Sequence, residues 1–297
     1  MNKIEFYKNR DLGERFSASA EFIRQNWKVM YKIILIPAIP LALLQGYFQQ
    51  GFVSNYLANL SKVFSGGSIT EMNNLYGNGG VWMYFLMTLL FSLVLSAMSG
   101  AIMSRYEDGL LSNETKLKDL SNKIFSNMGK LILIGLSLIL IAIVVVIILV
   151  LMIFIMAMMS KILAFLIAFA VIIAVFPPLY LIRFPALFQG ESTFKSIRKG
   201  FVLGFKNWGT TFLMILILGI VSYVISLIFA IPSAIWTITH IGDSAGVVAN
   251  ILSSFSSLGS AFVTPFVFVF MAFQYFSVAE KAEGISLQAK IEEFDNL

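Results

Sequence analysis

The chain has 297 residues, of which 58% are hydrophobic and 12% charged, and its mean hydropathy is +0.85. A soluble domain carries about 25% charged residues, so this composition excludes a soluble globule, while a disordered chain would have far less apolar surface. The absence of Cys excludes a disulfide scaffold and a thiol or Fe–S redox enzyme, so an integral membrane protein remains.

Six segments contain no Asp, Glu, Lys or Arg and reach the length of about 20 apolar residues that a helix needs to cross a bilayer. The third is the most apolar, since 18 of residues 131–152 are Leu, Ile or Val. No strict alternation typical of a transmembrane β-barrel is present. The sequence therefore predicts an all-α polytopic membrane protein, one domain over residues 1–297, with six transmembrane helices at about 31–49, 82–104, 130–157, 162–184, 209–232 and 247–278.

The distribution of Lys and Arg between the loops predicts the orientation. Of the 21 basic residues, 19 lie in the N-terminal segment, the loops after the second and fourth spans, and the C-terminal tail. Because cytoplasmic loops carry the excess of Lys and Arg, we expect both termini in the cytoplasm and the Gly-containing segment 52–80 as an outer loop. The net charge of +5 favours attraction to anionic lipids. No nucleic-acid-binding module is present.

Three charged segments lead into the first, third and fifth spans in a similar way. Each places residues at i, i+4, i+7 and i+11, which is one face of a helix, with Lys, Arg, Asp or Glu between them. We therefore expect short amphipathic helices at the cytoplasmic interface, and a possible threefold repeat of one such helix plus two spans; the alternative is ordinary basic loops. The aligned positions are Phe16, Ala20, Ile23 and Trp27; Leu117, Ser121, Ile124 and Met128; Ile197, Phe201, Gly204 and Trp208.

Specific lipid contacts follow from this hypothesis. The proposed lipid-facing anchors are large side chains at the head-group level, namely Trp27, Met128, Phe201 and Trp208. The proposed head-group contacts are the basic residues between them in the third segment, namely Lys195, Arg198 and Lys199. The predicted partners are therefore membrane lipids, in particular anionic ones, with a protein partner left unspecified.

The run Phe184-Pro185-Ala186-Leu187-Phe188-Gln189-Gly190-Glu191-Ser192, continued by a basic helix and then Asn207-Trp208, resembles the fourth loop of a group of bacterial six-span membrane proteins. This group includes the membrane domain of some glycerophosphoryl diester phosphodiesterases and the YciC-like inner-membrane proteins. The resemblance covers the six-span layout and, in specific residues, only 184–208. It implies an inner-membrane location and this architecture. It implies no activity, because the phosphodiesterase catalytic domain is a separate module and the segment after residue 279 is too short for it.

The sequence shows no pattern typical of an enzyme. Metal sites need clusters of His, Cys, Asp or Glu, and the single His240 stands beside only Asp243. Nucleophile elbows, P-loops and zinc-protease motifs are absent. We therefore predict no catalytic, cofactor-binding or metal-binding residue. Arg183 lies at the cytoplasmic end of the fourth span, where its side chain can extend to the interface.

Small polar stripes run along two spans. Their members are Ser92, Ser96 and Ser99 in the second span, and Ser253, Ser256, Ser260 and Thr264 in the sixth. Such residues let helices pack closely and hydrogen-bond across the contact, and this is one interpretation. The other is that the stripes face each other and line a semi-polar cavity. Pro177-Pro178 and Pro265 are expected to break the fourth and sixth spans.

Two classes of function remain open. The first is a non-enzymatic membrane protein of undefined molecular role that binds lipids or partner proteins through its basic amphipathic cytoplasmic helices. The second is a permease or channel for a small or amphipathic solute. The missing charge inside the spans favours the first, and a continuous cavity lined by the two serine stripes would favour the second.

Overall fold

The computed structural model describes residues 3–64, 79–157, 160–240, 246–288 and 291. None of these residues forms a strand. The helices are α1 (Leu12–Phe64), α3 (Gly79–Glu107), α4 (Leu117–Ala157), α5 (Lys161–Leu181), α6 (Arg183–Phe188), α7 (Thr193–Lys206), α8 (Trp208–Thr239) and α9 (Val247–Glu283). Six of them are long and apolar enough to cross a membrane, which confirms the predicted all-α, six-span fold.

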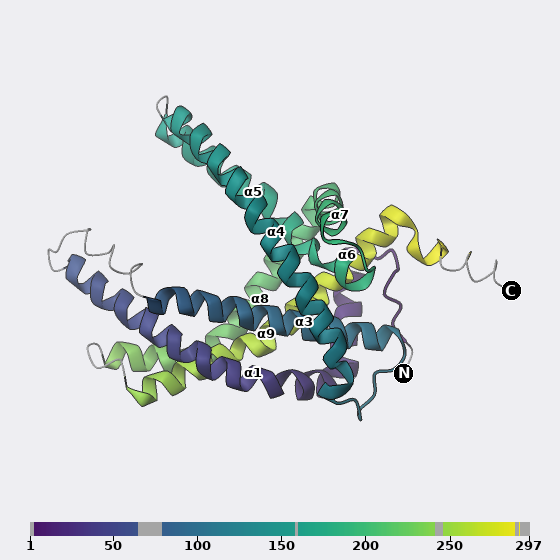
Figure 1. Ribbon diagram of the computed structural model, residues 1–297, viewed down its shortest axis with the longest axis horizontal. Coiled ribbons are helices and arrows are strands. Elements are labelled where there is room, and N and C mark those ends of the chain that lie inside the picture. Colours follow the sequence, from purple (N-terminus) through teal and green to yellow (C-terminus); the bar gives the residue numbers. More distant parts are fainter. Residues whose placement is uncertain (1–2, 65–78, 158–159, 241–245, 289–290, 292–297) are drawn as a thin grey trace.

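The helices form two groups that diverge from one end of the molecule (Figure 1). α1, α3, α8 and α9 form a bundle, in which α9 packs against the other three. α4 and α5 form a helical hairpin, which we call the α4–α5 arm, and it extends away from this bundle (Figure 1). The short helices α6 and α7 lie where the two groups meet, and α7 packs against α5.

The centre of the fold is the second half of α9. Every residue from Phe268 to Ala279 is buried. The N-terminal segment packs onto this stretch, and the ring of Phe6 lies 4.8 Å from that of Phe276 and 5.4 Å from that of Phe273. Polar contacts fix the same segment, because the backbone N–H of Arg10 donates to Ser277 Oγ over 2.9 Å. The buried core therefore lies at the end of the molecule where the two groups of helices meet.

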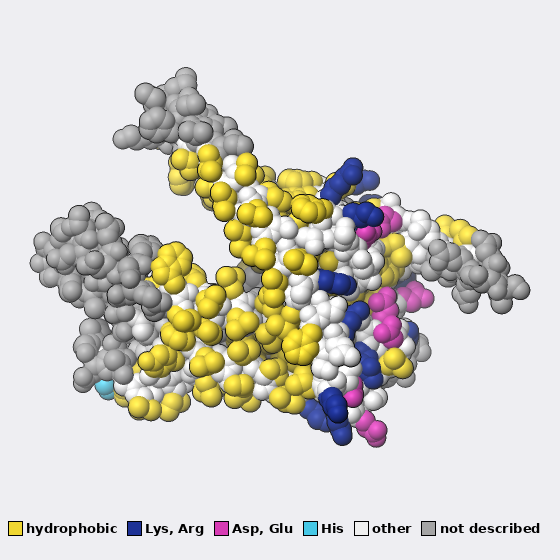
Figure 2. Space-filling model, viewed as in Figure 1, with side chains coloured by type: hydrophobic (Ala, Val, Ile, Leu, Met, Phe, Trp, Pro, Cys, Tyr) yellow, Lys and Arg dark blue, Asp and Glu magenta, His cyan; other side chains and the backbone are white. Residues whose placement is uncertain are grey.

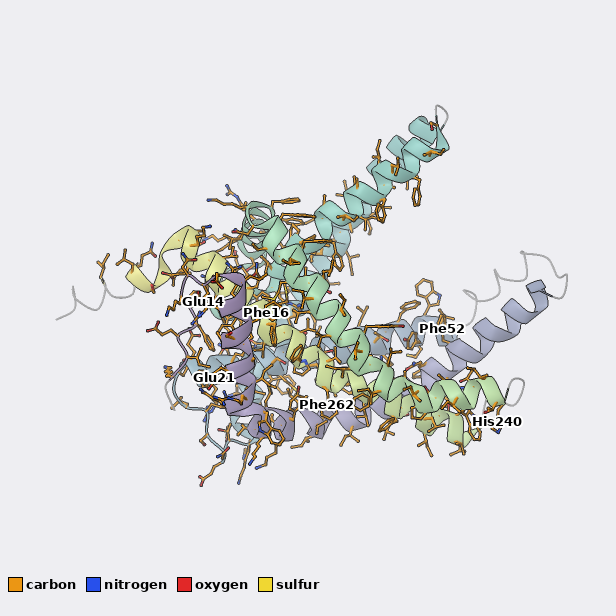
Figure 3. All side chains as sticks on the ribbon, turned by 180° about the vertical axis from the view of Figure 1, so that it is seen from behind. Glu14, Phe16, Glu21, Phe52, His240 and Phe262 are labelled. Atoms are coloured by element: carbon orange, nitrogen blue, oxygen red, sulfur yellow. The ribbon has the colours of Figure 1, made fainter. Side chains whose placement is uncertain are left out.

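Helix boundaries differ from the sequence prediction at several points. The first two amphipathic segments are not separate short helices, because α1 and α4 each continue from them into the span. α1 nevertheless changes direction, and the part that carries Glu14, Phe16 and Glu21 runs across the rest of the helix (Figure 3). The third segment is a separate helix, α7, which ends at its C-cap Asn207, directly before α8.

Two further expectations were wrong. Pro265 does not break the sixth span, because α9 continues through it. α5 also continues through Pro177 and Pro178 and ends at Leu181, so the fourth span is interrupted shortly after the two prolines and not at them. Neighbouring helices can satisfy the carbonyl that a proline leaves free in a membrane. The outer loop expected at 52–80 is shorter, because α1 extends to Phe64 and α3 begins at Gly79; the rest of that segment, 65–78, lies outside the described residues.

Candidate functional site

Charged side chains of both signs gather at the end of the molecule where the helices meet, which we call the charged end (Figure 2). The rest of the surface in this view is mainly apolar, as expected for helices that face lipid (Figure 2). The N-terminal segment, α7 and the last turns of α9 lie at this end (Figure 1) and carry charged residues. The predicted head-group contacts Lys195, Arg198 and Lys199 belong to α7 and lie here.

The helix α7 packs tightly against the C-terminal part of α5. Its buried side chains are Ser196, Ile197, Gly200, Leu203 and Gly204. Both glycines are required by close approach, because a Cβ at Gly200 would collide with the Ile182 backbone and one at Gly204 with that of Pro178. This arrangement resembles the small-residue contacts of membrane helices, so the face that we predicted to meet lipid at Ile197 and Gly204 is buried inside the protein.

The outward face of α7 has two chemically different flanks. On one flank Phe194 is 75% exposed and Phe205 49% exposed, and the ring of Phe205 stacks on that of Phe201. On the other flank Lys195 and Lys206 are exposed, and Arg198 lies between the two flanks. An aromatic flank beside a basic one is typical of a helix that lies in a membrane interface. The exposed aromatic residues Phe194 and Phe205 were not among the predicted anchors. They lie seven residues before and four residues after Phe201, a spacing that places all three on one face of a helix and that is visible in the sequence.

The predicted head-group contacts fall into two kinds. Lys195 and Arg198 are exposed, and no ion pair among the described residues involves either of them. Lys199 differs, because its Nζ lies 2.6 Å from Glu283 Oε2 at the end of α9. Lys199 is therefore already paired within the protein and connects α7 to α9.

The predicted lipid anchors also differ from one another. Trp27 is 51% exposed, with the Nζ of Lys28 5.8 Å from its ring centroid. Met128 packs against the main hydrophobic core, and Phe201 is partly buried against a small cluster that includes Ile134. Trp208 donates its Nε1–H to the Ala174 carbonyl over 3.0 Å, which connects the start of α8 to α5.

The serine stripes mainly serve helix packing. Ser253 donates to Gln50 Oε1 over 2.7 Å and Ser257 donates to Gln49 Oε1 over 3.0 Å, so α9 and α1 share a polar contact. Ser96 and Ser99 are buried, and Ser99 donates to its own helix at the Leu95 carbonyl. Ser256 and Ser260 are partly buried. Of the two α9 serines that bond to α1, Ser253 belongs to the predicted stripe and Ser257 does not.

Two members of the stripes, Ser92 and Thr264, line a cavity of about 800 Å³. Its wall is built from α3, α4, α5, α8, α9 and the first residue of α6, and it lies between the α4–α5 arm and the bundle. Most of the lining is apolar, and Ser96, Ser99, Ser253, Ser256 and Ser260 do not contribute to it. The two stripes therefore do not form one continuous polar cavity through the described residues.

Arg183 also lines this cavity. We had expected its side chain to extend towards the interface, but it lies among the rings of Tyr180, Phe184 and Phe268. Sequence reasoning missed this position because a basic residue at the end of a span is usually directed to the head groups. One feature of the sequence indicates that Arg183 is not an ordinary interfacial residue: it lies in a segment, 177–188, that is otherwise uncharged and contains three prolines.

No family model, no curated protein and no solved structure matches this chain. The resemblance of residues 184–208 to the YciC-like group and to the phosphodiesterase membrane domain therefore stays a prediction.

Proposed function

We propose that this chain is a non-enzymatic multi-pass protein of the bacterial inner membrane that binds anionic lipids at its cytoplasmic surface through α7. The supporting observation is the outward face of α7, with Phe194 and Phe205 exposed beside Lys195, Arg198 and Lys206. Aromatic rings enter the boundary between head groups and acyl chains, while each Lys or Arg near an anionic surface contributes about 1 kcal/mol. A protein partner for the same face is the less favoured interpretation.

The proposed orientation rests on the basic residues, which gather at the charged end together with the N-terminal segment and the end of α9 (Figure 2). Because the chain has no Cys, single cysteines test this orientation directly. Ser160→Cys, between α4 and α5 at the far end, should react with an impermeant thiol reagent in intact cells. Ser112→Cys, in the exposed segment between α3 and α4, should react only after the membrane is opened. The opposite labelling pattern would overturn the orientation.

Lipid binding is tested by purifying the full chain from bilayers of mixed phosphatidylglycerol and phosphatidylcholine and measuring the ratio of the lipids that remain bound. Lys195→Glu combined with Arg198→Glu should lower the enrichment of phosphatidylglycerol by at least tenfold, since two favourable contacts of about 1 kcal/mol each become repulsive. The matched control is Lys8→Glu with Lys281→Glu, which changes the net charge equally at exposed positions outside α7. If both pairs lower the enrichment equally, net charge and not α7 determines lipid selection.

The alternative function, a permease for an amphipathic solute, is favoured by one observation, the cavity between the arm and the bundle. The polar contact between α1 and α9 does not extend this cavity, because the Ser253 and Ser257 hydroxyls are already hydrogen-bonded to glutamines of α1. Uptake of a solute into vesicles by the purified protein would place this alternative first.

A further inference from the structure

Of the described residues that line the cavity between the α4–α5 arm and the bundle, only Arg183 is charged. It is the first residue of α6 and follows directly on the end of α5. The neighbouring residue Ile182 is held by the close approach of Gly200 in α7. The position of Arg183 is therefore fixed by two helix contacts, and its side chain has a defined place in the cavity wall.

The guanidinium group of Arg183 has aromatic neighbours but no carboxylate partner. Its Cζ lies 5.7 Å from the ring centroid of Tyr180, 5.3 Å from that of Phe184 and 5.4 Å from that of Phe268. Its Nε is enclosed and has no hydrogen-bond acceptor. Among the described residues, neither of the two ion pairs includes Arg183. A cation that is partly removed from solvent and has no counter-charge is unfavourable in a medium of low dielectric constant, so an anion would stabilise this site.

The remainder of the cavity wall is suited to a hydrocarbon chain. It runs along α4 from Leu131 to Leu138 and along α8 from Ile215 to Ser222. At 1.5 Å per residue, Ser222 lies about 20 Å along α8 from Trp208, so the wall extends from the charged end well into the apolar part of the protein. A volume of about 800 Å³ falls within the range of about 300–1,000 Å³ that is typical of small-molecule sites.

We propose that this cavity binds one amphipathic anion, whose acidic group contacts Arg183 and whose acyl chain lies along the apolar wall. A phosphate or carboxylate oxygen accepts charge-assisted hydrogen bonds from a guanidinium group and supplies the counter-charge that Arg183 lacks. The hydroxyl of Ser222 is a second enclosed polar group without a partner in this wall. This site goes beyond the proposed role of α7, since it holds a single molecule between the arm and the bundle and uses none of the basic residues of α7.

The test uses the purified full chain, depleted of lipid in detergent and then given dioleoyl phosphatidic acid or dioleoyl phosphatidylcholine. Native mass spectrometry should detect one molecule of phosphatidic acid retained per chain, and no comparable retention of phosphatidylcholine. Arg183→Gln should weaken this retention at least tenfold, while Arg183→Lys, which keeps the charge, should weaken it less. Lys195→Glu with Arg198→Glu should leave the retained molecule in place, which separates this site from the surface of α7.

Two further variants test the apolar wall without altering the charge. An added Cβ at Gly135 or Gly219 meets no atom within 4 Å, and both residues line the cavity. Gly135→Leu and Gly219→Leu should therefore fold and should lower retention by filling the space of the acyl chain. Gly209→Leu is the matched control, because Gly209 is equally unobstructed but lies outside the cavity. If Arg183→Gln fails to fold, these variants still test whether the retained molecule lies in this cavity.

Excess inorganic phosphate distinguishes the source of the anion. It should not displace phosphatidic acid, because a free ion gains nothing from the apolar wall. Complete displacement by phosphate would overturn the proposal in favour of a simple anion site. Unchanged retention in Arg183→Gln, or equal retention in Gly135→Leu, Gly219→Leu and Gly209→Leu, would overturn it as well.

Discussion

α9 and the α4–α5 arm are both apolar enough to cross a membrane, but they occupy opposite environments. In the most apolar stretch of α9, 72% of the residues are buried in the protein, against 6% in that of α4. α4 is also the most hydropathic of the six spans, whereas α9 and α1 are the least. The spans at the centre of this protein are thus the less hydrophobic ones, and the span most exposed to lipid is the most hydrophobic.

This difference follows from the solvent. Lipid chains are as apolar as Leu, so burial of apolar surface between helices gives little driving force within a bilayer. Central helices associate through close packing and hydrogen bonds, which require small and polar residues such as Gly46, Ser253 and Ser254. A helix that is surrounded by lipid needs an apolar surface on all sides, and it does not need small or polar residues for contact with other helices. Reduced hydropathy with regularly spaced Ser and Gly is therefore a sign of a central span.

The largest effect is expected from the aromatic core of α9. Phe273 is fully buried, and its ring contacts those of Phe6, Phe22 and Phe276. Phe273→Ala should lower the free energy of unfolding in detergent by about 3–5 kcal/mol, since it leaves a cavity in a packed core. Ile143→Ala on the arm, where Ile143 is largely exposed, should change it by no more than about 0.5 kcal/mol. Similar losses from both variants would contradict the division between core and arm.

A smaller loss is expected where α1 approaches α9. A Cβ at Gly46 would collide with the backbone and Oγ of Ser254, whereas one at Gly51 meets no atom within 4 Å. Gly46→Leu should therefore lower stability by about 1–3 kcal/mol through overpacking. Gly51→Leu, the same substitution on the same helix, should not destabilise the protein. Thermal unfolding of the two variants measures the difference, and an equal melting temperature would show that the helices do not touch at Gly46.

The smallest effect concerns the hydrogen bonds between these helices. Ser253→Ala removes the donor to Gln50 Oε1, and such a bond contributes about 0.6 kcal/mol in a membrane protein. Ser137→Ala on α4, where no hydrogen bond of the Ser137 hydroxyl is found among the described residues, should cost less. Chemical denaturation in matched detergent resolves this difference. A larger loss from Ser137→Ala would indicate that the arm makes specific contacts of its own.

Much of the site could be expected from the sequence, but the direction of its side chains could not. The register of Ile197, Phe201 and Gly204 predicted a helix before the fifth span, and α7 lies there. The face at Ile197 and Gly204 was misassigned, because a small apolar face suits a neighbouring helix as well as lipid. Lys199 could not be separated from its neighbours, since its partner Glu283 lies 84 positions away in the chain.

The sequence by itself determined the six spans and the helical class, because uncharged runs of this length are stable only where the backbone satisfies its own hydrogen bonds in lipid. It also placed the charged residues outside those runs. The tertiary structure alone decided that α9 is the core, that the α4–α5 arm diverges from it, and that Arg183 faces the cavity between them. These outcomes depend on which faces of the helices pack against each other. That packing is determined by contacts between residues far apart in the chain, and hydropathy along the sequence contains no information about such contacts.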